Sequence, residues 1–112
     1  MKQVAVIHTA FEDSPRTVAF VNVPDEFSAD MALEYAFRKT QNIEGSWSKP
    51  QVFEFDGQVI KNGDFSEDVT VMASLPVEGG VEYGLRSTSV NDQILFGTKK
   101  YKVAGFGFEE IV

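Results

Sequence analysis

The C-terminal stretch from Arg86 to Ile111 decides the fold and reads RSTSVNDQILFGTKKYKVAGFGFEEI. Its first apolar run, Ile94 to Phe96, is interrupted by Gly97-Thr98, and a second run from Tyr101 to Phe108 begins soon afterwards. Two short β-prone runs around a glycine-containing turn predict a β-hairpin. The preceding residues, Ser89 to Asp92, are typical of a turn, because Asn and Asp side chains bond nearby backbone amides. We therefore expect this hairpin to anchor the rest of the sheet.

The N-terminal third contains two strand patterns followed by one helical pattern. Val4–Thr9 and Thr17–Val23 are rich in β-branched residues, and the short polar connection between them favours an antiparallel pair. Apolar residues occupy both odd and even positions of these runs, which indicates strands that are covered on both faces. From Ala29 to Thr40 the apolar residues recur at i, i+3, i+4 and i+7, which predicts a helix with Ser28 as its N-cap. The helix should end near Gln41-Asn42.

The middle of the chain is dominated by turn signals. Residues 43–51 form a predicted loop with the only Trp, and Val52–Phe55 then meets Asp56-Gly57, a strong two-residue hairpin turn with residues 58–61 as its returning strand. Residues 69–73 are a further predicted strand, and residues 75–80, which contain Pro76 and Gly79-Gly80, are a predicted loop.

This order of elements predicts a single α+β domain spanning residues 1–112. We expect one main helix packed on a mostly antiparallel, strongly curved sheet. The alternative is a small, partly open β-barrel with one helix, because many short strands curl readily.

Composition restricts the classes of function. The net charge of −7 arises from 17 acidic and 10 basic residues, and such a field repels phosphate backbones, so direct nucleic-acid binding is disfavoured. The absence of cysteine excludes a disulfide framework and a thiolate metal site. No run approaches the roughly 20 apolar residues of a membrane span, so we expect a cytoplasmic protein without a membrane partner.

His8 is the one candidate for acid–base catalysis, because its unperturbed pKa lies near neutrality. With Ser87, Thr88 or Ser89 and with Asp92 it could be written as a hydrolytic triad. The Gly-x-Ser-x-Gly signature that would support a hydrolase is absent. A lone strand histidine is more often structural, so the sequence favours a non-enzymatic protein.

The acidic loop that follows Asn62-Gly63 contains Asp64, Glu67 and Asp68, which are the candidate metal ligands. The ordered spacing of a calcium loop is missing, so a solvated loop is the preferred interpretation. Gly105 and Gly107 lack a following helix and do not form a phosphate cradle. No cofactor is expected.

Four residues have the chemistry that most often anchors protein interfaces, namely Trp47, Tyr83, Arg86 and Tyr101. Trp47, in a Gly-Ser-Trp-Ser loop, is either an exposed contact or a ring that folds back onto the core, and the second interpretation is favoured because burial of such a ring removes about 150–250 Å² from water.

Two blocks of sequence carry a resemblance. The first is Ala32 to Ile43 followed by Gly45-Ser46-Trp47, and the second is Arg86 to Asp92 followed by Tyr101-Lys102-Val103 and residues 105–108. Together they resemble small accessory proteins of bacteriophages and other mobile elements, which have a helix ending in Leu-Thr-Asn, then a Trp, and later an Arg-Ser-x-Ser-Val-Gly-Asp turn, a hairpin and a terminal Gly-Phe. Here Lys39 and Gln41 depart from the pattern, and Asn91 replaces the turn glycine, which Asn tolerates. The resemblance implies a small cytosolic protein of a phage or its bacterial host, and it brings no catalytic residue.

The sequence therefore favours a phage-like accessory protein that binds a host or phage protein, with a basic partner suited to its charge. A small hydrolase that uses His8 and an acidic mimic of nucleic acid are the alternatives. A homodimer is a further hypothesis, because two-fold dimers are the commonest assembly.

Overall fold

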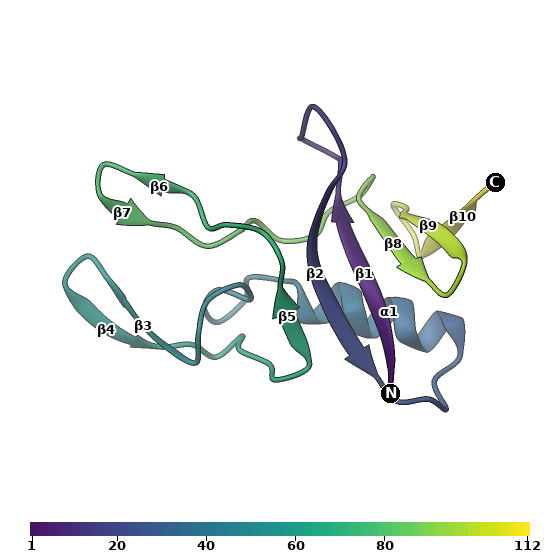
Figure 1. The fold of residues 1–112 in the computed structure, drawn as a ribbon, viewed down its shortest axis with the longest axis horizontal. Coiled ribbons are helices and arrows are strands. Elements are labelled where there is room, and N and C mark those ends of the chain that lie inside the picture. The colour runs from purple at the N-terminus through teal and green to yellow at the C-terminus, as the bar shows by residue number, and fades with distance from the viewer.

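The computed structural model describes residues 1–112 as an α+β fold built on one six-stranded sheet (Figure 1). All neighbouring strands are antiparallel, in the order β10-β9-β8-β1-β2-β5. The strands of this sheet are β1 (Lys2–His8), β2 (Arg16–Val23), β5 (Val69–Val71), β8 (Gln93–Phe96), β9 (Lys99–Val103) and β10 (Phe108–Ile111). The single helix, α1, spans Ala29–Lys39. Two separate hairpins are formed by β3 (Val52–Phe55) with β4 (Gln58–Lys61) and by β6 (Val77–Glu78) with β7 (Val81–Glu82).

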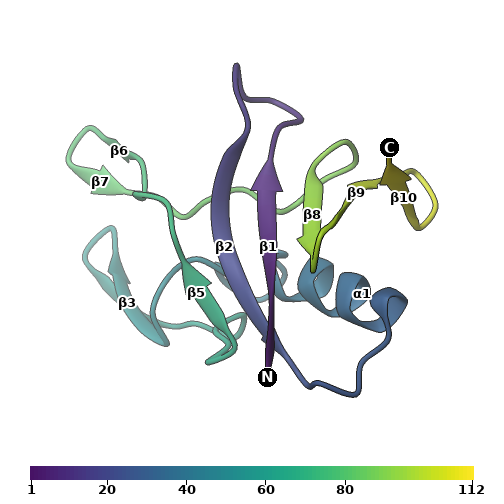
Figure 2. The same ribbon diagram turned by 45° about the vertical axis from the view of Figure 1, so that its right-hand side comes forward.

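The core lies between α1 and the central strands β1, β2 and β8 (Figures 1 and 2). Ala32, Leu33 and Ala36 of the helix are buried, as the predicted apolar stripe requires. The Ser28 hydroxyl accepts a hydrogen bond from the Met31 N–H, which confirms the predicted N-cap. The predicted antiparallel pairing of the first two strands is also confirmed.

The backbone turns follow the chemistry of their residues. Gly97 has φ 63° at the first central position of the β8–β9 turn, which closes the predicted C-terminal hairpin. Asp56 and Gly57 both have positive φ, 52° and 78°, as the predicted β3–β4 turn requires. Asn91 adopts φ 79°, so it takes over the left-handed position of the turn glycine.

The predicted strong curvature is wrong, and so is the barrel alternative. The sheet is open, with β10 and β5 as its two edges, and it is neither strongly curled nor closed. Closure would require the edges to pair, but β5 has only three residues, after which the chain leaves the sheet for the β6–β7 hairpin. No helix of the structure is long and apolar enough to cross a membrane.

Two details of the C-terminal half differ from the sequence prediction. Residues 75–80 do not form a simple loop, because Gly79 and Gly80, with φ 58° and 79°, close the β6–β7 hairpin. The run from Tyr101 to Phe108 is not continuous either, since the Ala104 N–H donates to the Gly107 carbonyl in a turn between β9 and β10. Phe106 is therefore fully exposed while Phe108 is half-buried, and the two rings do not share a face.

Candidate functional site

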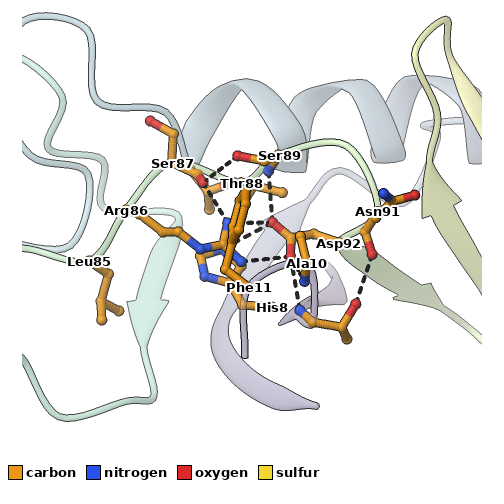
Figure 3. Close-up of polar contacts among 12 residues, drawn as sticks. His8, Ala10, Phe11, Leu85, Arg86, Ser87, Thr88, Ser89, Asn91 and Asp92 are labelled. Carbon is orange, nitrogen blue, oxygen red and sulfur yellow. Dashed lines mark hydrogen bonds and ion pairs between the residues drawn. The ribbon is translucent and has the colours of Figure 1, made fainter. Parts of the chain in front are cut away.

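The buried carboxylate of Asp92 lies at the centre of a network and accepts five hydrogen bonds (Figure 3). Arg86 donates to it twice, from Nη1 to Oδ2 at 2.7 Å and from Nη2 to Oδ1 at 2.8 Å. The backbone N–H groups of Thr9, Ala10 and Ser89 also donate to it, at 2.9, 3.0 and 2.7 Å. Asp92 thereby connects the β1–β2 loop to the segment that precedes β8.

These contacts decide the charge of Asp92. Its burial alone would raise the pKa, but the hydrogen bonds from Arg86 and from the backbone N–H groups of Ala10, Ser89 and Thr9 lower the pKa to about 2. The carboxylate is therefore ionised and fully engaged at neutral pH. It has no free lone pair directed toward a substrate.

Arg86 also binds the carboxylate of Glu12, through the Nε and Nη2 side of its guanidinium group. Its Nε and Nη2 donate to Glu12 at 3.2 and 2.8 Å, and the ring of Phe11 lies 4.9 Å from the guanidinium carbon. Hydrogen bonding to Asp92 raises the pKa of Arg86, and hydrogen bonding to Arg86 lowers that of Glu12. Arg86 thus acts as a clamp between two segments far apart in sequence.

His8 is buried beside this network and does not form a triad. Its Nε2 lies 3.0 Å from the Thr88 hydroxyl and 3.9 Å from Asp92 Oδ2. A triad uses the two ring nitrogens for the acid and the nucleophile separately, whereas here both partners face the same nitrogen. The imidazole is only 2 % exposed, and none of the four surface cavities includes it. Desolvation lowers its pKa below 6.5, so His8 is neutral at pH 7.

The segment from Leu85 to Thr88 is fastened to the end of α1. The Thr88 N–H donates to the Thr40 carbonyl at 3.0 Å, and the Gln41 side-chain amide donates to the Thr88 carbonyl at 2.8 Å. Asn42 donates from its backbone to the Ser87 hydroxyl at 2.8 Å and from its side chain to the Leu85 carbonyl at 2.9 Å. The Thr40 carbonyl at the C-cap is a backbone acceptor that a helix end otherwise leaves open, and the bond from Thr88 satisfies it.

Trp47 completes this connection from the following loop. Its indole Nε1 donates to the Arg86 carbonyl at 2.8 Å, and its backbone N–H donates to the Asn42 side chain at 2.9 Å. The two blocks of sequence that carry the resemblance are therefore in direct contact. No buried side-chain nitrogen or oxygen lacks a hydrogen-bond partner in this structure.

The four predicted interface residues do not gather on one surface. Trp47 is 2 % exposed, so its ring folds back onto the core, which confirms the favoured interpretation and excludes the alternative of an exposed contact. Arg86 is engaged by its two carboxylates. Tyr83 is exposed beside the β6–β7 hairpin, and Tyr101 is half-buried in β9.

The three candidate metal ligands have different surroundings in the structure. Asp64 accepts hydrogen bonds from the backbone N–H groups of Ile43 and Glu44, at 2.7 to 3.1 Å. Asp68 accepts from the Tyr35 hydroxyl, and burial together with this carboxylate raises the pKa of Tyr35 to about 12. Glu67 is exposed. No group of three His, Cys, Asp or Glu residues is arranged to hold a metal ion.

A feature not predicted from the sequence is a projecting unit, here called the arm, formed by the β3–β4 and β6–β7 hairpins, residues 52–61 and 77–82. Both hairpins lie on the β5 side of the molecule, outside the main sheet (Figures 1 and 2). Phe55 and Tyr83 meet edge to face at 5.6 Å, which joins the two hairpins. Lys49 fixes the junction, because its Nζ donates to the Glu82 carbonyl at 2.6 Å and lies 4.6 Å from the centre of the Phe53 ring.

The arm exposes both apolar and acidic side chains. Val59 is 76 % exposed and Val77 is 61 % exposed. Between the hairpin turns lies a cleft of about 330 Å³ whose charged lining residues are Glu54, Asp56 and Glu82. The molecule exposes 6862 Å² of surface, whereas about 6,100 Å² is typical of a folded monomer of this mass. The excess agrees with a projecting unit that has surface available for a partner.

Comparison of the chain with protein-family models, with curated proteins and with solved structures found no match.

Proposed function

We propose that this protein is a small phage-like accessory protein that works by binding another protein, of phage or host, through the arm, without catalysis. The observation that carries the proposal is the arm itself: two hairpins outside the main core, joined by Phe55, Tyr83 and Lys49. Short hairpins are marginal alone, so their mutual packing gives a preformed surface. A preformed surface reduces the ordering cost of association.

The charge of the arm indicates the chemistry of its partner. Three carboxylates line the cleft between the hairpin turns, and Lys49 is buried at the base of the arm with its ammonium group already hydrogen-bonded to the Glu82 carbonyl. A Lys or Arg side chain of a partner fits this cleft, and apolar partner residues fit beside Val59 and Val77. The basic groove of a nucleic-acid-binding protein is one surface of this kind.

The site around His8 supports a hydrolase less well. The histidine is enclosed, its single polar nitrogen contact is with Thr88, and the carboxylate beside it is saturated by Arg86 and backbone donors. General base catalysis needs a nitrogen within reach of a substrate proton.

The test is affinity capture from a bacterial lysate with the wild-type protein and two charge-reversed variants of equal net charge. The arm variant is Glu54→Lys with Glu82→Lys, and the matched control is Glu26→Lys with Glu34→Lys, all at exposed positions. We expect one partner to be retained by wild type and control, lost by the arm variant, and released as salt rises from about 50 to 300 mM. Equal retention by both variants would reject the arm as the contact surface.

A further inference from the structure

The largest cavity of the molecule is an open surface pocket lined by residues at the start of β1 and the end of β8, none of which belongs to the arm. Its volume is about 550 Å³, within the range of roughly 300–1,000 Å³ that is typical of small-molecule sites. The β8–β9 turn and the first residue of α1, Ala29, also line it. The side chains that bear on its chemistry are Lys2, Gln3, Phe96, Thr98, Lys99 and Tyr101.

The charge of this cavity is opposite to that of the protein. Both charged lining residues, Lys2 and Lys99, are cationic, although the net charge of the chain is −7. Lys2 has no carboxylate partner, and its Nζ lies 5.6 Å from the centre of the Phe96 ring. Lys99 has only an exposed ion pair with Glu110, at 3.8 Å, and such pairs contribute little. Both ammonium groups are exposed, and neither has a buried carboxylate partner, so an anion can reach both of them.

The walls between the lysines are aromatic. Phe96 and Tyr101 are half-buried, since both pack against the core, and this fixes their rings at the cavity. Gln3 and Thr98 add hydrogen-bonding groups at the rim. Sites of this kind combine apolar contact with a few polar groups that set the orientation of the ligand.

We propose that this cavity binds a small organic anion that carries a planar ring, of the class and size of a nucleoside monophosphate. Lys2 and Lys99 hold the anionic group, and Phe96 and Tyr101 hold the ring by stacking or edge contact. The site is separate from the arm, so it gives the protein a ligand-binding activity beyond the proposed protein contact.

The experiment follows the backbone amide signals of Gly97, Thr98 and Lys99 by NMR during titration with adenosine 5′-monophosphate, adenosine and inorganic phosphate. We expect saturable shifts with the monophosphate and much weaker ones with the other two probes. Lys2→Gln with Lys99→Gln should weaken binding at least about tenfold. The matched control is Lys100→Gln, which removes the same kind of charge from the same strand but lies outside the cavity.

Three results would overturn the proposal. They are an absence of saturable shifts at millimolar monophosphate, equal affinity for inorganic phosphate, and equal weakening by Lys100→Gln. Equal affinity for inorganic phosphate would mean that the aromatic walls make no contribution to binding. Equal weakening by Lys100→Gln would mean that charge acts nonspecifically. Because all three lysines are exposed, their replacement leaves the core unchanged, and loss of binding in a folded variant reports on the site.

Discussion

Replacement of Asp92 by Asn removes one charge from the centre of the buried network while leaving the size of the side chain almost unchanged. Oδ1 accepts from Thr9, Ala10 and Arg86, and Oδ2 accepts from Ser89 and Arg86. An Asn side chain has one oxygen, so its NH₂ group must face at least two donors. In either orientation of the amide, its N–H groups face the N–H donors of Arg86 and of the backbone. The Arg86 guanidinium also loses one of its two carboxylate partners.

The expected cost follows from burial. Loss of one partner of a buried ion pair costs about 3–5 kcal/mol, and the lower end applies here because Arg86 keeps Glu12. For a domain slightly above 100 residues, a loss of about 3 kcal/mol lowers Tm by roughly 10 °C. The matched control is Glu12→Gln, which removes the other carboxylate from the same guanidinium. Glu12 is 27 % exposed, so its loss should cost about 1 kcal/mol or less.

Urea unfolding measures both variants, with the fluorescence of Trp47 as the probe, since this single Trp is buried and becomes exposed on unfolding. We expect Asp92→Asn to lose clearly more stability than Glu12→Gln. If the two variants lose the same free energy of unfolding, Asp92 does not organise the connection between the β1–β2 loop and the Arg86–Asp92 segment.

Four other outcomes are expected. Desolvation lowers the pKa of His8 below 6.5, so the unfolded chain binds that proton first. Stability is complete above pH 6.5 and falls as pH drops toward the folded-state pKa, and urea titrations of His8→Gln should lack this loss. The pKa of Asp92 is lowered from 3.8 to about 2, so a second loss of about 2 kcal/mol occurs as pH falls from about 4 to about 2, and Asp92→Asn should lack it. Trp47→Phe loses the hydrogen bond to Arg86 and leaves a gap, so its Tm by circular dichroism should correspond to a destabilisation of about 2–3 kcal/mol. Gly57→Ala strains a residue at φ 78° without meeting any neighbour, so it should cost about 1 kcal/mol, with NMR shifts confined to the arm.

Elements governed by local chemistry could be predicted from the sequence. The capped helix from Ala29, the Asp56-Gly57 turn and the Gly97 hairpin each depend on residues within a few positions of one another. The openness of the sheet could not be predicted in this way. It depends on whether β5 and β10 meet, which is decided by the path of the chain between residues 72 and 92.

The candidate site also combines features that the sequence predicts with features that only the fold shows. The segments that contain Trp47 and Arg86 lie far apart in sequence, and only the fold shows that the Trp47 indole donates a hydrogen bond to the Arg86 carbonyl. The sequence offers His8 with Asp92 only as a weak catalytic candidate, and only the structure shows that both are buried, with Thr88 and Asp92 facing the same nitrogen of His8. The arm was missed because Lys49 and Glu82 are 33 positions apart, and no sequence period links them.

The most direct test of the proposed contact is photo-crosslinking from the arm in bacterial cells. A benzophenone amino acid replaces Val59, which is 76 % exposed on β4, and in a control it replaces Glu34 on the outer face of α1. We expect position 59 to yield one dominant crosslinked protein, Glu54→Lys with Glu82→Lys to suppress it, and position 34 to yield none. Crosslinks to that same protein from position 34, or none from position 59, would contradict the proposed role of the arm.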